Sequence, residues 1–348
     1  MAHDHLIVPN FAETGLYGVW WGHSSAKIRP DPPAVDRVIV LAHGIHQHAA
    51  LYENFAKHLI GTLCRGDQYN DALKYAVFAY DIRGFGHSVG RGDLDANARG
   101  MITDFDDAVE DLRNACKYAK DASGAEKLFL FGHSLGGLLA VMLGVSLLSS
   151  DNDSNDAGAS QDAKSGTTRL KVDGFILSGP SVAVVPSLRY IPAETILGCL
   201  PATLTLDTYK KGTATDNAAF LQAWDSGESE GLVLPERPFY ARYVQAAVRA
   251  QKAVRQHFGR VGTVAPMLVL HGTHDTHDCG AAEDLYAACG GTQIPAAGDG
   301  TASPFLRSHV SLNKNEGFKH EDIVFKDFPS MDRNPAVADM VKWLADLA

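Results

Sequence analysis

The sequence predicts an α/β fold in which a mostly parallel central sheet is flanked by helices. Strand-like apolar runs alternate with helix-like segments along most of the 348 residues, which is typical of a parallel sheet covered on both faces. Residues 75–80 and 127–131 are apolar nearly throughout, as expected for strands that are buried on both sides. The chain is long for one domain, but α/β units often reach this length.

The order of the elements follows from these runs and from the turn residues between them. Strands are expected at 37–41, 75–80, 127–131, 172–177, 267–270 and, more weakly, 309–312. Helices are expected at 51–63, 104–120, 135–148, 281–288 and 335–347. Asp104 and Asp107 give the second of these helices an acidic first turn, which suits the positive end of the helix dipole.

Two segments break the alternation. Residues 149–168 are rich in Ser, Asp, Asn and Gly, and this composition predicts a flexible, solvated surface insertion. Residues 179–263 contain six prolines between two expected strands, and a connection this long must carry structure of its own. We therefore expect a core made of 1–178 and 264–348, with an inserted helical cap over 179–263.

Two Gly-His-Ser-x-Gly runs compete for the role of nucleophile. Ser134 lies between an apolar strand and an apolar helix, where a sharp turn exposes a serine oxygen above the sheet and needs glycines around it. Ser88 lies among closely spaced glycines with no apolar helix behind it, which indicates a loop. Ser134 is therefore the candidate nucleophile, and Ser88 is not.

A serine hydroxyl needs a base to take its proton and an acid to orient that base. Asp275 follows the expected strand 267–270, where catalytic groups gather in such sheets, and Asp278 is the second choice of acid. Of the histidines after Asp275, His320 lies between the last strand and the last helix, which is where the base is expected. His277 shares the loop of the acid, and His309 begins the weak strand, so both are less favoured.

The negative charge that develops on the substrate oxygen needs backbone N–H donors. Leu135 follows the nucleophile and begins a helix, so its amide is one candidate. Ile45 lies in the His-rich loop directly after the strand 37–41, and its amide is the other. His43 and His48 are expected to shape this loop through hydrogen bonds.

With these residues placed, the chain resembles the monoacylglycerol lipase and lysophospholipase branch of the α/β-hydrolases. The resemblance covers most of the length and is carried by five motifs in the family order, at 43–52, 80–88, 132–137, 271–275 and 316–320. It departs from the family at 49–51 and in the insertion, and it is loose in the cap.

The resemblance implies a serine esterase or lipase that cleaves a monoacylglycerol or lysophospholipid through Ser134, His320 and Asp275, without a cofactor. The substrate contacts expected with it are His43, Gly44, His133 and, in the cap, Leu200. A thioesterase, an amidase or peptidase with the same triad, and a low-turnover ligand-binding scaffold remain alternatives. The apolar residues of the cap have two possible interpretations. They pack within the cap, or they are exposed and contact an acyl chain or a lipid surface.

Composition limits the partners. A net charge of −10 argues against nucleic acid, because phosphate contacts need clustered Lys and Arg. The His-rich run 271–279 matches no standard zinc spacing, so no metal is expected. The first residues lack a secretory signal pattern, and five cysteines without a C-x-x-C favour free thiols. We expect a cytoplasmic protein, with peripheral contact to a membrane or lipid droplet through the cap left open, and the oligomeric state undetermined.

Overall fold

A computed structural model describes residues 5–22, 34–64, 73–89, 99–156, 170–183, 193–277, 280–290 and 310–347. Its centre is an eight-stranded sheet in the order β1-β2-β4-β3-β5-β6-β9-β10. The strands are β1 (His5–Val8), β2 (Gly18–Gly22), β3 (Arg37–Ala42), β4 (Tyr75–Tyr80), β5 (Lys127–His133), β6 (Gly174–Ser178), β9 (Met267–Gly272) and β10 (Val310–Asn315). Every pair from β4 to β10 is parallel, and only β1 and β2 run antiparallel to their neighbours. The predicted α/β class, with a mostly parallel sheet, is therefore confirmed.

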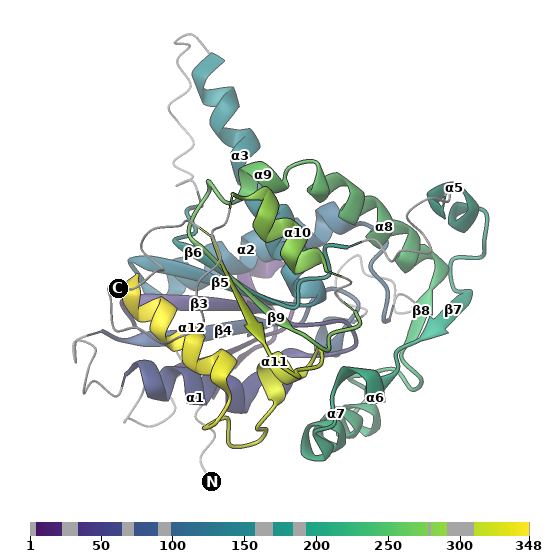
Figure 1. Cartoon of the computed structure of the whole chain (residues 1–348), viewed down its shortest axis with the longest axis horizontal. Helices are drawn as coiled ribbons and strands as arrows, with labels where there is room; N and C mark the ends of the chain where they lie inside the picture. Colours follow the sequence, from purple (N-terminus) through teal and green to yellow (C-terminus); the bar gives the residue numbers. More distant parts are fainter. Residues whose placement is uncertain are drawn as a thin grey trace.

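Helices cover both faces of this sheet (Figure 1). On one face, α1 (Glu53–Leu63) packs against α12 (Pro335–Asp346). On the other, α2 (Phe105–Ser123) packs against α3 (Leu135–Asp156), and both contact the central strands. The described chain also contains α10 (Ala281–Ala288), α11 (Asp322–Phe325) and, at the end of the segment expected to form the cap, α9 (Phe258–Val261). Short 3-10 turns are η1 (Phe11–Glu13), η2 (Ala49–Tyr52) and η3 (Gly86–Ser88).

The expected strands and helices are present, with shifted ends. The Asp104 side chain caps α2 by accepting a hydrogen bond from the Asp106 amide, and Asn334 caps α12 in the same way. The helix expected to end at 148 continues to Asp156, so the first residues of the predicted insertion are helical. Helix propagation needs no large apolar residue, and the first glycine or proline after 148 is Gly158. The rest of that insertion, 157–169, lies outside the described residues.

The segment expected to form the cap contains α5 (Ala193–Gly198), β7 (Thr205–Thr208), α6 (Lys211–Ala214), α7 (Ala218–Ser229), β8 (Pro238–Tyr240) and α8 (Ala241–Arg255). In Figure 1 most of these elements project from one side of the molecule, beyond the sheet. β7 and β8 form a separate antiparallel pair, and α5 packs on α8. Within the described residues, no helix has both the length and the apolar character needed to cross a membrane.

Candidate active site

Ser134 stands at the tight turn between β5 and α3. Its φ of 52° lies in the left-handed region, which non-glycine residues adopt only where the surroundings enforce it. Its amide donates to the Ser178 carbonyl (2.9 Å), and its carbonyl accepts from the Ser181 amide (3.0 Å). A Cβ on Gly136 would collide with the Ala42 carbonyl of β3, and one on Gly132 with the Gly136 carbonyl. The glycines are thus required by close backbone approach, as the motif predicts.

Asp275 and His320 form a buried pair. The Nδ1 of His320 lies 2.7 Å from Oδ2 of Asp275, while Oδ1 of Asp275 accepts a hydrogen bond from the His277 amide (2.8 Å). Burial alone would raise the pKa of Asp275, but His320 and these hydrogen bonds outweigh it and hold the pKa well below its usual range. The carboxylate is therefore ionised and Nδ1 of His320 carries the proton, so Nε2 is the unprotonated nitrogen of the ring.

The pair forms because β9 and β10 are parallel neighbours whose following loops are joined by hydrogen bonds. β9 and β10 end in register at Gly272 and Asn315. Beyond them, the His274 amide donates to the Phe318 carbonyl (2.9 Å) and the Thr273 amide to the Asn315 carbonyl (3.1 Å). These bonds place the loop of the acid against the loop of the base.

The end of β6 connects Ser134 to this pair. Ser178 binds the backbone of Ser134, and the next residue, Gly179, has a φ of 48°. A Cβ on Gly179 would lie 3.0 Å from Nδ1 of His320 and 3.1 Å from Oδ2 of Asp275. The Ser181 hydroxyl lies 3.1 Å from that of Ser134. Ser134, Asp275 and His320 are therefore brought to one region at the carboxyl ends of β5, β6, β9 and β10.

His133 and His43, both expected to contact substrate, have structural positions instead. His133 is completely buried, with Nδ1 3.0 Å from the Ser178 hydroxyl and Nε2 3.0 Å from Oε2 of Glu321. His43 is also completely buried. Its Nε2 accepts from the Ile82 amide (3.0 Å), so its Nδ1 donates to the Gly44 carbonyl (2.7 Å). No ring nitrogen of either histidine is left for a substrate.

Polar side chains hold the loop that carries Ile45. His43 and His48 were predicted to do so, and the His43 ring does bind the Gly44 carbonyl, whereas the contributions of Gln47 and Tyr52 were not predicted. The Gly44 amide donates to Oε1 of Gln47 (2.8 Å), and the Tyr52 hydroxyl donates to the same oxygen (2.6 Å). The Gly136 amide donates to the His43 carbonyl (3.1 Å), which ties this loop to the start of α3. Leu135 is the first residue of α3, so its amide has no acceptor within the helix. The amides of Ile45 and Leu135 remain the predicted oxyanion donors.

Ser88 is the last residue of the short 3-10 turn η3, within the glycine-rich connection that was predicted to be a loop. It is buried, and its hydroxyl accepts from the Tyr17 amide (3.0 Å). Asp81 braces this loop by accepting from the His87 amide (2.7 Å) and the Ala49 amide (2.6 Å). Arg83, in the same connection, pairs with Asp107 and Asp111 of α2. These contacts give Ser88 a structural position away from a strand-to-helix turn.

Three residues near the site, Ser181, Tyr209 and Glu321, were not predicted from the sequence, and His277 was considered only as a less favoured base. The ring of Tyr209, from the cap, stacks on His277 with centroids 5.2 Å apart, and the His277 ring lies 4.9 Å from that of His320. Burial, followed by the charge on His320, lowers the pKa of His277 to about 4. Only Glu321 had a sequence signal, as an acid directly after the candidate base.

Two three-residue sets among the described residues could bring ligand atoms within 4.8 Å of one another, and both include His320. Those sets are His133, His320 and Glu321, and Asp275, His277 and His320. A metal in either set would compete with hydrogen bonds that the same atoms already make. The alternative acid Asp278 and the alternative base His309 lie outside the described residues. Leu200, the expected cap contact, follows α5 and is partly buried.

Comparison with known proteins shows the family of this chain. Residues 33–295 match the Hydrolase_4 family, described as serine aminopeptidase, S33. Human monoglyceride lipase is 33% identical over 106 residues, which cover 30% of this chain and 29% of the human protein, so the match spans less than a third of that relative.

Two solved structures align over nearly the whole chain. The monoacylglycerol lipase of Paleococcus ferrophilus aligns with a TM-score of 0.60 and 18% identity, covering 96% of this chain and 99% of its own. A soluble variant of the monoglyceride lipase of Saccharomyces cerevisiae, in complex with a substrate analog, aligns with a TM-score of 0.63 and 17% identity, covering 99% and 97%. The fold is thus the α/β-hydrolase fold.

Proposed function

The chain belongs to the Hydrolase_4 family, and from that premise we propose that it is a serine ester hydrolase that cleaves monoacylglycerol to fatty acid and glycerol. The proposal depends on the position of Ser134, whose backbone has left-handed φ. Ser178 and Gly179 at the end of β6 place this serine near the buried His320–Asp275 pair. The partial match to human monoglyceride lipase supports the choice of substrate.

In the proposed mechanism, the Ser134 hydroxyl attacks the ester carbonyl while Nε2 of His320 takes its proton. Asp275 keeps the Nδ1 proton in place and stabilises the imidazolium that forms. The amides of Ile45 and Leu135 stabilise the negative oxygen of the tetrahedral intermediate. His320 then protonates the departing glycerol oxygen, and water cleaves the acyl-enzyme with His320 again as base.

The decisive test compares the two serines. Ser134→Ala is expected to abolish both ester turnover and labelling by a fluorophosphonate probe, whereas Ser88→Ala keeps the labelling. Labelling that persists in Ser134→Ala and disappears in Ser88→Ala would contradict the assignment.

The leaving group is tested separately with one panel of substrates. Monoolein, a lysophospholipid, an acyl-CoA and an aminoacyl amide are offered to the same purified protein. The proposal expects the highest kcat/KM for monoolein. A preference for the amide would instead favour the peptidase activity that the family description names, and tight binding with negligible turnover would favour a ligand-binding scaffold.

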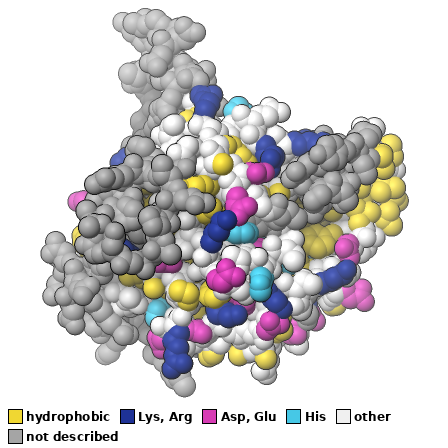
Figure 2. All heavy atoms as spheres, viewed as in Figure 1, with side chains coloured by type: hydrophobic (Ala, Val, Ile, Leu, Met, Phe, Trp, Pro, Cys, Tyr) yellow, Lys and Arg dark blue, Asp and Glu magenta, His cyan; other side chains and the backbone are white. Residues whose placement is uncertain are grey.

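The exposed apolar side chains of the cap support the proposal of peripheral contact with a lipid surface. Ile196, Leu204 and Leu206 are 51%, 41% and 41% exposed, and they belong to the few large hydrophobic residues that are exposed in the described chain. Figure 2 shows hydrophobic side chains gathered on the cap side of the molecule. Replacing all three with Ser is expected to weaken co-flotation with phosphatidylcholine vesicles while leaving hydrolysis of a soluble short-chain ester unchanged.

A further inference from the structure

We propose that Glu321 is a positioning residue that holds the nucleophile turn, the oxyanion loop and the cap in their working arrangement. This inference rests on the proposed function, because it concerns the geometry around Ser134 and His320. Glu321 directly follows the base in the sequence and is 1% exposed. A buried carboxylate is costly unless several donors satisfy it.

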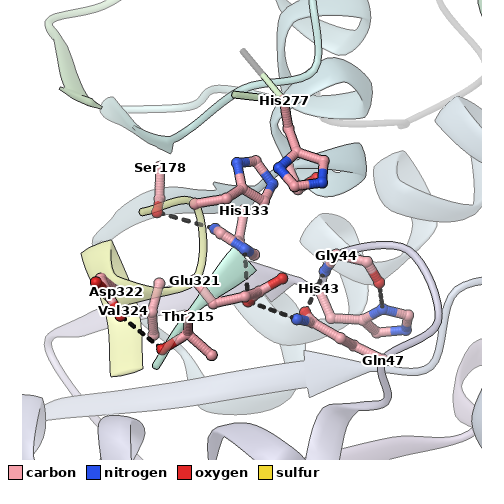
Figure 3. Close-up of polar contacts among 12 residues, drawn as sticks. His43, Gly44, Gln47, His133, Ser178, Thr215, His277, Glu321, Asp322 and Val324 are labelled. Atoms are coloured by element: carbon pink, nitrogen blue, oxygen red, sulfur yellow. Dashed lines mark hydrogen bonds and ion pairs between the residues drawn. The ribbon is translucent and has the colours of Figure 1, made fainter. Parts of the chain in front are cut away.

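Three donors from distant parts of the chain meet on this carboxylate. Oε2 accepts from Nε2 of His133 (3.0 Å) and from Nε2 of Gln47 (2.8 Å), and Oε1 accepts from the Tyr209 hydroxyl (3.0 Å). Figure 3 shows Glu321 between His133 and Gln47, with Gly44 beyond Gln47. One side chain therefore contacts the residue before the nucleophile, the oxyanion loop and the cap.

The carboxylate also sets the orientation of the Gln47 amide. A carboxylate only accepts hydrogen bonds, so Gln47 turns its NH₂ group to Glu321 and its oxygen to the Gly44 amide. That oxygen fixes the backbone next to Ile45, one of the two proposed oxyanion donors. His133 is oriented in the same way, because its Nε2–H points at Glu321 and its Nδ1 then accepts from the Ser178 hydroxyl.

The backbone around Glu321 reinforces its contact with the cap. The Glu321 amide donates to the Ala214 carbonyl of α6 (2.9 Å), and the next residue, Asp322, accepts from the Thr215 hydroxyl (2.6 Å). The loop of the base and this part of the cap are thus bonded to each other. A shift of the cap at Tyr209 would therefore move the Glu321 carboxylate, which orients Gln47 and His133.

Glu321 is a fixed negative charge beside the base. Burial alone would raise its pKa, but His133, His320 and the hydrogen bond from Gln47 outweigh burial and lower the pKa to about 2. Nitrogen atoms of His320 and His133 and a carboxylate oxygen of Glu321 lie within 4.8 Å of one another. Among the described residues, Asp275 and His277 are further titratable groups beside His320, and Tyr209 stacks on His277. A carboxylate at this distance favours the imidazolium that His320 becomes during the reaction.

The test is Glu321→Gln measured beside Asp111→Asn in the whole chain. Asp111 of α2 is a suitable control, since it is also a buried carboxylate but pairs with Arg83. Glu321→Gln is expected to lower kcat on a soluble p-nitrophenyl ester by about 10–10²-fold with little change in KM, because small misplacements of reacting groups are costly. The acid limb of the kcat/KM profile should move to lower pH in Glu321→Gln, whereas Asp111→Asn should keep both the kcat and the limb.

Glu321→Asp distinguishes the effect of the negative charge from the effect of the position of the carboxylate. It keeps the negative charge but draws the carboxylate back by one methylene, so kcat should fall while the acid limb stays in place. If Glu321→Gln does not fold, the kcat of this variant still decides the question. A wild-type kcat in a folded Glu321 variant, or an equal loss of kcat in Asp111→Asn, would overturn the proposal. Turnover by Ser134→Ala would instead mark a failure of the proposed function.

Discussion

The Nδ1 nitrogen of His320 lies 2.7 Å from Oδ2 of Asp275, and both side chains are almost completely excluded from solvent. This contact decides which nitrogen of the imidazole carries the proton. Because the pKa of Asp275 is held low by His320 and by the His277 amide against the effect of burial, the carboxylate remains an acceptor throughout the working pH range. The opposite nitrogen, Nε2, is then the unprotonated one, and the proposed mechanism needs it as the acceptor of the Ser134 proton.

Asp275→Asn tests that relationship directly. An amide can present its NH₂ group to Nδ1, which would move the imidazole proton to Nε2 and remove the base. We expect kcat to fall by about 10⁴-fold, the size of effect that such a change has in serine proteases, with a circular dichroism spectrum like that of the wild type. Asp278→Asn, at the other candidate acid, should keep most of the activity. The reverse result would transfer the role of the acid to Asp278.

Much of the core and of the triad could be predicted from the sequence because local signals specify them. β4 and β5 are apolar runs long enough to be read as buried strands, and Ser134 carries its own strand-turn-helix signature. β2 was missed because its five residues begin and end with glycine, which is typical of a loop. β7 was missed because its residues are mostly exposed, so no apolar pattern marks it.

The contacts of Glu321 could not be predicted, because they join residues far apart in the sequence. Its partners Gln47, His133 and Tyr209 lie 274, 188 and 112 positions away. The order of the strands brings Gln47 and His133 to Glu321, and the position of the cap brings Tyr209 to it. The same is true of Gly179, whose lack of a side chain leaves room for the His320–Asp275 pair. Periodicity and motifs give information about residues that are close in the sequence. These contacts depend instead on which strand ends lie next to each other in the folded sheet.

The histidines of the oxyanion loop should make the fold sensitive to acid. Burial lowers the pKa of His43 and of His46 to about 3, and burial followed by the charge on His87 lowers that of His48 to about 4. In the unfolded chain these groups bind protons near their ordinary pKa of 6.5. Between about pH 6.5 and 4 the unfolded state therefore holds more protons, so the free energy of unfolding should fall as the pH is lowered.

Urea unfolding at a series of pH values measures this dependence, and His48→Gln isolates one contribution. The variant cannot take up that proton. The slope of its free energy of unfolding against pH should therefore be smaller than that of the wild type, by an amount that corresponds to at most about one bound proton. A slope identical to that of the wild type would show that His48 is protonated equally in both states, contrary to its burial.

A buried hydrogen bond between the cap and the oxyanion loop can be removed with little change in shape. Nε1 of Trp224 in α7 donates to the His46 carbonyl (2.6 Å), and the Arg237 guanidinium lies 4.7 Å from the centre of the indole ring. Trp224→Phe keeps an aromatic ring but leaves that carbonyl without its donor, at a cost of about 1–3 kcal/mol. Urea unfolding should show this loss, and unchanged stability would mean that the bond contributes nothing.

Close packing at the nucleophile turn predicts an unusually severe effect for a small substitution. A Cβ added at Gly136 would collide with the carbonyl group of Ala42 in β3, and neither backbone can retreat, since α3 begins here and β3 is hydrogen-bonded on both edges. Gly136→Ala should therefore lower the free energy of unfolding by about 3 kcal/mol or more and remove fluorophosphonate labelling of Ser134.

The matched control is Gly212→Ala in α6, where a Cβ would meet nothing within 4 Å. There alanine is favoured over glycine in a helix by roughly 0.5–1 kcal/mol, so this variant should be at least as stable as the wild type. Equal stability of the two variants in urea would contradict the close approach of α3 to β3.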